Sequence, residues 1–256
     1  MLEIIVKTIC EALDAGTLQS HIRETLKGQL RYARAQCFAT CGAEQLRALG
    51  SDKWDVVRPA LEWWRQYLAT AAPRLIPLEP VKSYPRLFLD GACEEGQCGT
   101  SIGGVLVIPG KKVQAFHHVV PWALVEKWKA ETQGKGDPSR TQVIGQAEIA
   151  PVQIALMTWA QLLRGKHVAI FIDNDAARLG LVKGYSPSLA SARLIGTVHL
   201  MLAELAIFAW FARVPTLSNV ADGPSRGMIP VAFDNVAAVV PDEWKVNASA
   251  CLEVGL

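Results

Sequence analysis

The chain has 256 residues, and its 26 Lys and Arg against 24 Asp and Glu leave a net charge of only +2. This excludes a polybasic tail, so any nucleic-acid site must be local. Half of the residues are hydrophobic, which is too apolar for a disordered protein. No apolar run is long enough for a membrane span, and no C-x-x-C pair occurs among the six cysteines. We therefore expect a protein without a membrane partner in a reducing intracellular compartment, cytoplasmic or nuclear.

The first 72 residues are predicted to form a helical segment. Hydrophobic residues recur every four positions from Leu18 to Leu30, and a second helix is predicted over Trp54–Thr70. The basic residues between Arg23 and Arg34 occupy the remaining faces. They form either a solvated surface or a surface that holds phosphate groups, and both interpretations stay open. Four prolines within 73–85 then predict a linker and a domain boundary.

Residues 86–228 change to strand and helix patterns and are predicted to form one domain. Two of three short strands flank a Pro-Gly-Lys turn, which predicts an antiparallel meander at Leu87–Ala92, Ile102–Gly110 and Val113–Pro121. Residues 122–145 are predicted to be a short helix followed by a mobile loop.

The rest of this domain alternates between helix and strand. The patterns predict, in order, a helix at Gln146–Arg164, a buried strand at His167–Asn174, helices at Ala176–Lys183 and Ser188–Phe208, and a strand at Ala209–Thr216. Pro151 is tolerated in the helix at Gln146–Arg164 only because it is expected to lie near the first turn. The order predicts an α/β fold with a mixed five-stranded sheet flanked by helices. Residues 229–256 give no functional signal and are assigned as a C-terminal tail.

Four carboxylates stand at positions typical of a site: Asp90, Glu148, Asp173 and Asp222. Asp90 and Asp173 end strands, and the carboxyl ends of strands in an α/β sheet gather ligands at one edge. Clustered carboxylates repel unless cations neutralise them, and hard oxygen ligands favour Mg²⁺ or Mn²⁺ over zinc. Two such ions suit hydrolysis of a phosphodiester. Each carboxylate by itself also fits a turn or a helix cap.

The segments LFLDGA, GGVL, QAEIAPVQIAL, FIDNDAA and SNVADGPSRG together resemble the ribonuclease H domain of retroelement reverse transcriptases. The resemblance covers roughly Arg86 to Gly227 and implies an RNase H-like fold. It implies a hydrolase that cuts the RNA strand of RNA–DNA hybrids with two Mg²⁺ ions, for which Mn²⁺ substitutes. The implied metal ligands and catalytic residues are Asp90, Glu148, Asp173 and Asp222, and the implied substrate contacts are Asn174, Asn219, Ser225 and Arg226.

The chain also departs from this family. Residues 122–145 are a longer insertion than usual, and VPTLSNVAD lacks the His that some relatives place before the last Asp. The polymerase motif Tyr-x-Asp-Asp is absent from the sequence, although residues 1–72 loosely resemble the segment that connects polymerase to nuclease. The resemblance therefore implies a part or remnant of a reverse transcriptase, with a polymerase domain outside this chain as a partner.

Other functions remain open. One is a non-catalytic RNase H-like module that braces a polymerase or binds nucleic acid, although retention of all four carboxylates argues against it. Another is an exonuclease or transposase of the same superfamily, although Asp90-Gly91-Ala92 lacks the Glu that such exonucleases carry. The pairs Cys37/Cys41 and Cys93/Cys98 have no accompanying His pattern, so free thiols are expected rather than a zinc site.

Overall fold

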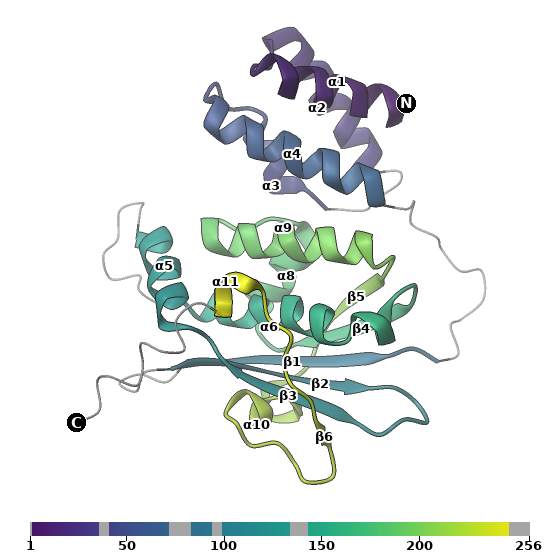
Figure 1. Ribbon diagram of the computed structural model, residues 1–256, viewed down its shortest axis with the longest axis vertical. Coiled ribbons are helices and arrows are strands. Elements are labelled where there is room, and N and C mark those ends of the chain that lie inside the picture. Colours follow the sequence, from purple (N-terminus) through teal and green to yellow (C-terminus); the bar gives the residue numbers. More distant parts are fainter. Residues whose placement is uncertain (1, 36–40, 72–82, 94–98, 134–142, 246–256) are drawn as a thin grey trace.

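A six-stranded mixed sheet lies at the centre of the computed structural model, which describes residues 2–35, 41–71, 83–93, 99–133 and 143–245 (Figure 1). In the order β5-β4-β1-β2-β3-β6, the strands are Phe208–Arg213, His167–Ile172, Arg86–Cys93, Thr100–Val107, Gln114–Val119 and Asp234–Asn235. Strands β1, β2 and β3 form the predicted antiparallel meander, and β4 and β5 run parallel to β1. The predicted α/β fold is confirmed, with the two-residue β6 as an additional edge strand.

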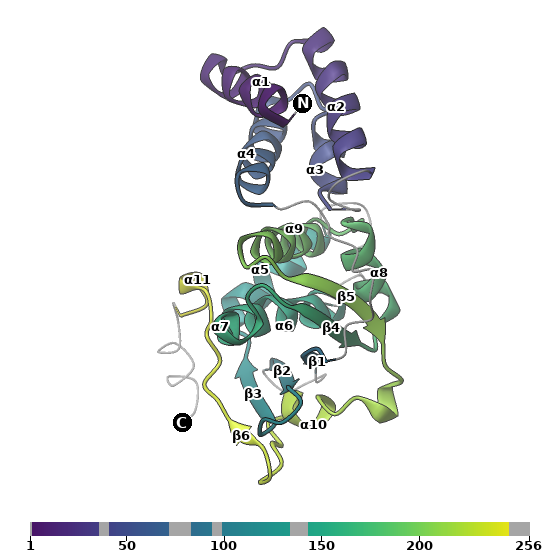
Figure 2. The same ribbon diagram turned by 90° about the vertical axis from the view of Figure 1, so that its right-hand side faces the viewer.

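Helices cover the two faces of the sheet unequally. Helices α6 (Ile144–Thr158), α8 (Asp175–Lys183) and α9 (Leu189–Glu204) lie on one face, and the short α10 (Asp222–Ser225) lies on the other (Figure 2). The other described helices in this part of the chain are α5 (Trp122–Gln133) and the shorter α7 (Ala160–Leu163), η2 (Thr216–Ser218) and α11 (Asp242–Lys245). Every residue of α6 from Gln146 to Leu156 is buried, so this helix is central to the main core.

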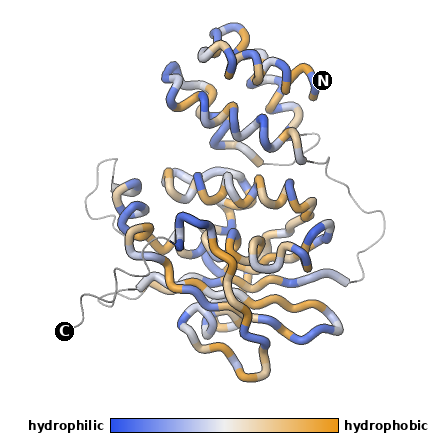
Figure 3. The backbone as a smooth tube through the Cα atoms, viewed as in Figure 1, coloured by the Kyte–Doolittle hydropathy of each residue, from blue (hydrophilic) through white to orange (hydrophobic). Residues whose placement is uncertain are grey.

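In ranges 2–35 and 41–71, the chain forms four helices with a core of their own. They are α1 (Leu2–Ala15), α2 (Ser20–Ala33), α3 (Ala43–Ala48) and α4 (Trp54–Thr70), and α4 confirms the helix predicted there. Hydrophilic and hydrophobic residues alternate along them, as amphipathic helices require (Figure 3). This unit packs on α9, where the Trp63 indole N–H donates a hydrogen bond to the Gly196 carbonyl at 3.0 Å.

Two predicted helices are shorter than expected. The helix expected at Gln146–Arg164 breaks at Trp159, whose φ of −110° and ψ of 21° separate α6 from α7. The helix expected to reach Phe208 ends at Glu204, because Ala206 takes a positive φ of 51° and turns the chain into β5. In the described ranges, no helix combines the length and apolarity that crossing a membrane demands.

Pro151 lies in the middle of α6 and not in its first turn, so that prediction was wrong. A proline has no backbone N–H, and the carbonyl of Ala147, four residues earlier, therefore loses its helical partner. That carbonyl faces Gly91 of β1, at the place where α6 comes closest to the sheet. The predicted mobile loop falls largely on 134–142, outside the described residues.

Candidate metal centre

Three carboxylates from separate elements meet near the carboxyl end of β4. The prediction that Asp90 ends a strand was wrong: Asp90 lies inside β1, because the pairing of β1 with β2 continues past it to Cys93. Asp90 belongs to β1, Glu148 lies in the second turn of α6, and Asp173 follows the last residue of β4. One oxygen from each lies within 4.8 Å of the others. Asp90 and Glu148 are buried, whereas Asp173 is half-buried and gives the cluster contact with solvent. The structure thus brings together three of the four acidic residues that the sequence singles out.

Gly91 allows α6 to approach β1 closely enough for this meeting. A Cβ atom at this position would lie 2.3 Å from the Ala147 carbonyl oxygen, a distance that no side chain tolerates. Because Glu148 follows Ala147 directly, the same close approach carries the Glu148 carboxylate to Asp90. Gly91 was not identified as a site residue from the sequence, where an Asp-Gly pair after an apolar run indicates only a turn.

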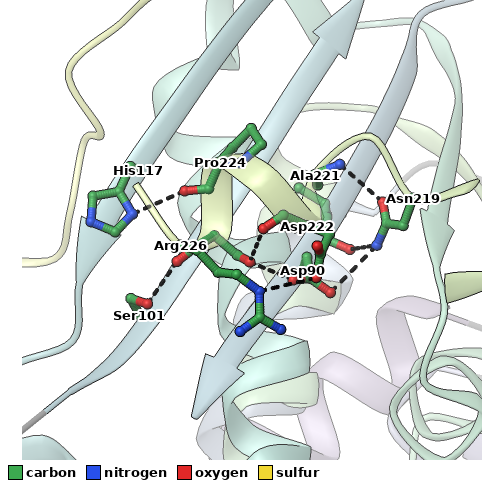
Figure 4. Close-up of polar contacts among 10 residues, drawn as sticks. Asp90, Ser101, His117, Asn219, Ala221, Asp222, Pro224 and Arg226 are labelled. Atoms are coloured by element: carbon green, nitrogen blue, oxygen red, sulfur yellow. Dashed lines mark hydrogen bonds and ion pairs between the residues drawn. The ribbon is translucent and has the colours of Figure 1, made fainter. Parts of the chain in front are cut away.

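A second glycine performs the same role on the opposite face of the sheet. Gly103 pairs with Asp90 across β1 and β2, and a Cβ there would lie 2.2 Å from the backbone nitrogen of Ser225 in α10. Two side chains hold α10 in place: the Ser101 hydroxyl donates to the Ser225 carbonyl at 2.6 Å, and His117 Nδ1 donates to the Pro224 carbonyl at 3.0 Å (Figure 4). A carbonyl only accepts, so Nδ1 carries the proton.

Asp90 is held by two buried polar side chains. The Ser225 hydroxyl lies 2.5 Å from Asp90 Oδ2, and Asn219 Nδ2 donates to the Leu89 carbonyl at 3.1 Å and lies 3.5 Å from Asp90 Oδ1 (Figure 4). Asn219 also accepts a bond from the backbone N–H of Ala221. The sequence resemblance implied substrate contacts for Asn219 and Ser225. The structure places both side chains against Asp90 and buries them, with Ser225 fully inaccessible.

The other implied residues lie around the rim of the cluster. Asp222 is outside the group of three carboxylates, and its Oδ1 pairs with Arg226 Nε at 3.3 Å on a half-exposed surface. Asn174 caps α8, its side-chain oxygen accepting a bond from the Ala177 N–H at 3.0 Å. Sequence reasoning missed Ser101 and His117, since nothing in a strand pattern marks a side chain that anchors a distant helix.

The buried charge of the cluster is strongly unfavourable without a cation. Burial, together with the charges of Asp90 and Asp173, raises the pKa of Glu148 to about 9. Burial also raises the pKa of Asp90 to about 6; its hydrogen bond from Ser225 opposes this shift, and the charges of Asp173 and Asp222 add to it. Within the described ranges, Glu148 Oε2 and Asp173 Oδ1 are buried atoms without a hydrogen-bond partner. Unpaired, closely spaced hard oxygen donors fit a divalent cation such as Mg²⁺ or Mn²⁺.

The zinc alternative is only partly within the described residues. Cys41 is a buried free thiol and Cys93 an exposed one, while Cys37 and Cys98 lie outside the described ranges. Cys10 is also a free thiol. The three described cysteines therefore form no disulfide, and the expectation against a zinc site stays a prediction.

The chain matches no protein-family model and no curated protein. Among solved structures it is similar to RNase H1 from the halophilic archaeon Halobacterium salinarum NRC-1, at 16% identity and a TM-score of 0.40, covering 56% of this chain and 96% of that one. It is also similar to the N-terminal RNase H domain of a Mycobacterium tuberculosis protein fused to maltose-binding protein, at 12% identity and a TM-score of 0.36, covering 59% and 96%.

Proposed function

We propose that the protein is a divalent-metal-dependent endonuclease that hydrolyses the RNA strand of RNA–DNA hybrids. The observation that carries this proposal is the cluster of Asp90, Glu148 and Asp173, with two buried oxygens that lack a hydrogen-bond partner. The hybrid as substrate is supported by the sequence resemblance to ribonuclease H domains. Shape and 2′-hydroxyl contacts, rather than base reading, would select the RNA strand.

Asp90, Glu148 and Asp173 would hold two Mg²⁺ ions, with Mn²⁺ as a substitute. When bound, the ions supply Lewis-acid activation of the phosphodiester and of the attacking water. Asp173, the least buried of the three, would be the ligand most accessible to a substrate that approaches from solvent. Buried Asp90 is kept in one orientation by Ser225 and Asn219, which we assign as positioning residues rather than substrate contacts.

Asp222 remains the proposed fourth ligand. Its charge already acts on Asp90, but its carboxylate is paired with Arg226 and would have to turn from that partner to reach a cation. Arg226 would then present its guanidinium to a substrate phosphate, for which its planar donors are suited. Asn174 uses its side-chain oxygen in the α8 cap, so its amide NH₂ is the group that would contact substrate.

A polymerase partner and an origin in a retroelement reverse transcriptase are further proposals that rest on the sequence resemblance alone. The reducing intracellular compartment is also a proposal, and it rests on the cysteine pattern of the sequence. The contacts between the N-terminal helices and α9 give this unit a packed position beside the nuclease fold, as a connector would have. Co-purification with a separately expressed polymerase domain of the same element would test the partnership.

The function is tested with labelled RNA–DNA hybrid, duplex DNA, duplex RNA and single strands, each with Mg²⁺ or Mn²⁺. We expect cleavage of RNA in the hybrid only. Asp173→Asn should reduce the rate of hybrid cleavage by more than about a hundredfold. Mutating a residue that only supports a metal ligand already costs about 10–100-fold, and loss of the ligand itself should cost more. Asp175→Asn, an exposed neighbour paired with Arg178, is the control.

Each other outcome contradicts a defined part of the proposal. Full activity in Asp173→Asn would overturn the metal assignment. Hybrid binding without cleavage at any metal concentration would favour the non-catalytic module. Equal cutting of duplex DNA would favour the exonuclease or transposase.

A further inference from the structure

An open groove lies on the N-terminal helical unit, away from the carboxylate cluster. It is lined by Lys27 and Arg31 of α2 and by Ala43, Leu46 and Arg47 of α3. Three cationic side chains therefore surround a small apolar floor. We call this feature the α2–α3 groove.

The α2–α3 groove carries an excess of positive charge. Lys27 pairs with Glu24 at 2.8 Å and Arg47 pairs with Glu44 at 3.1 Å, whereas the exposed Arg31 forms no ion pair with any residue in the described ranges. The pKa of Glu24 is lowered first by its hydrogen bond from Lys27 and further by the charges of Lys27, Arg31 and Arg23. The surface thus favours a negatively charged ligand.

Helix α8 connects the carboxylate cluster to this groove. It begins at Asp175, two residues after Asp173, and its nine residues span about 14 Å. At its other end the Gly184 carbonyl accepts a hydrogen bond from the Glu44 N–H at 3.3 Å, and the Arg47 guanidinium lies over the Tyr185 ring at 5.3 Å. Figure 2 shows α2 and α3 above α8 on the same side of the molecule.

Between the carboxylate cluster and the α2–α3 groove, the surface of α8 is exposed to solvent and carries no net negative charge. Leu179, Val182 and Lys183 are exposed along it, and Arg178 neutralises Asp175 at 2.9 Å. Lys183, at the groove end, has no ion pair with a residue that the structure describes. A polyanion lying on α8 therefore meets cations at the groove end and the proposed metal ions at the other.

We propose that the α2–α3 groove binds the phosphate backbone of the nucleic acid that enters the carboxylate cluster. This inference rests on the proposed function, since it takes the same polyanion as the ligand. Ammonium and guanidinium groups set around an open groove suit repeated phosphates, and such contacts position a strand without reading its sequence. A local patch also explains how a chain with a net charge of only +2 binds nucleic acid.

The test is binding of a fluorescent RNA–DNA hybrid of about two helical turns, measured by anisotropy without added metal across about 50 to 200 mM salt. The variant is Lys27→Gln/Arg31→Gln/Arg47→Gln. Its matched control, Lys7→Gln/Arg58→Gln/Arg65→Gln, removes the same charge from exposed positions of α1 and α4. We expect the groove variant to bind about tenfold more weakly, with a salt slope shallower by about two to three, because each lost phosphate contact reduces the slope by about 0.9. The control should keep most of the wild-type affinity.

Equal binding by the two triple variants, or no binding by the wild type at low salt, would overturn the inference. An acidic protein as the true ligand would give the first of these results. Thermal unfolding checks that the groove variant folds, and the single reversal Arg31→Glu gives the same test with less perturbation. Cleavage is assayed separately on the wild type: groove-dependent binding without cleavage would contradict the proposed function while supporting the groove.

Discussion

The Ser225 hydroxyl and the Asp90 carboxylate lie 2.5 Å apart although 135 positions separate them in the chain. The same hydroxyl is 2.8 Å from the Asp222 carbonyl. It has one hydrogen, so it donates to Asp90 when that carboxyl is ionised and to the carbonyl when Asp90 holds the proton. The bond therefore favours the ionised form of Asp90, which is the form that binds a cation.

Ser225→Ala should lower cleavage at neutral pH by about 10- to 150-fold, because a hydrogen bond to a charged group contributes about 1.5–3 kcal/mol. The pKa of Asp90 should rise, so the acid limb of the pH–rate profile should move to higher pH. A merely structural role for Ser225 would lower activity without moving that limb. Ser218→Ala, on the exposed η2 turn, should leave rate and profile unchanged.

Gly91→Ala should separate α6 from β1, because the new methyl group would overlap the Ala147 carbonyl. We expect a loss of about 1–3 kcal/mol in the free energy of unfolding and a loss of metal affinity. Gly28→Ala is the matched control: it lies exposed in α2 with open space around its Cβ position, and should stabilise by about 0.5–1 kcal/mol. Chemical denaturation measures both. Unchanged stability in Gly91→Ala would contradict the close approach.

The metal-free protein should become less stable as pH rises. Burial raises the pKa of Glu148 from 4.5 to about 9, so between these values the folded chain holds a proton that the unfolded chain has lost. The free energy of unfolding should therefore fall through this range, and Glu148→Gln should remove more than about 2 kcal/mol of the fall. Urea denaturation in a chelator at several pH values checks this. Glu62→Gln, on exposed α4, should keep the wild-type slope.

Binding of Mg²⁺ at pH 7 should release protons, because cation ligands must be ionised and Glu148 is protonated there in the metal-free state. Calorimetry in two buffers of different ionisation enthalpy measures the number released. In Glu148→Gln we expect about one proton fewer and weaker binding. Proton release that does not change in this variant would place the ion elsewhere.

His199 should destabilise the fold in acid. Burial lowers its pKa to about 4 despite the bond between Nε2 and the Leu181 carbonyl, whereas its ordinary value is 6.5. The unfolded chain therefore binds a proton that the folded chain does not, and stability is lost as pH falls from 6.5 to 4. Between pH 4.5 and 6.5 this contribution opposes that of Glu148. His199→Gln, whose amide still donates to Leu181, should therefore make the free energy of unfolding fall more steeply with rising pH in that range, at a cost of about 1 kcal/mol at pH 7. A wild-type profile in the variant would contradict this.

Much of the fold could be predicted because its signals are local. Alternation and apolar runs placed the meander of β1, β2 and β3, and the apolar spacing in Trp54–Thr70 matched α4 to the residue. Helix ends were predicted less well, since the break at Trp159 and the positive φ of Ala206 depend on packing. Pro151 shows the same limit: a proline is tolerated in the middle of α6 in a place where the Ala147 carbonyl packs against Gly91 of β1, which is a tertiary contact.

By itself the sequence placed carboxylates in or beside predicted strands and helices, and so identified Asp90, Glu148, Asp173 and Asp222 as candidate ligands. Only the tertiary structure decided that Asp90, Glu148 and Asp173 meet, that Asp222 forms an ion pair with Arg226, and that the Ser225 hydroxyl forms a hydrogen bond with Asp90. The reason is physical. Strand and helix patterns arise from neighbours a few residues apart, whereas a buried contact depends on how closely two elements pack, and here Gly91 and Gly103 set that distance.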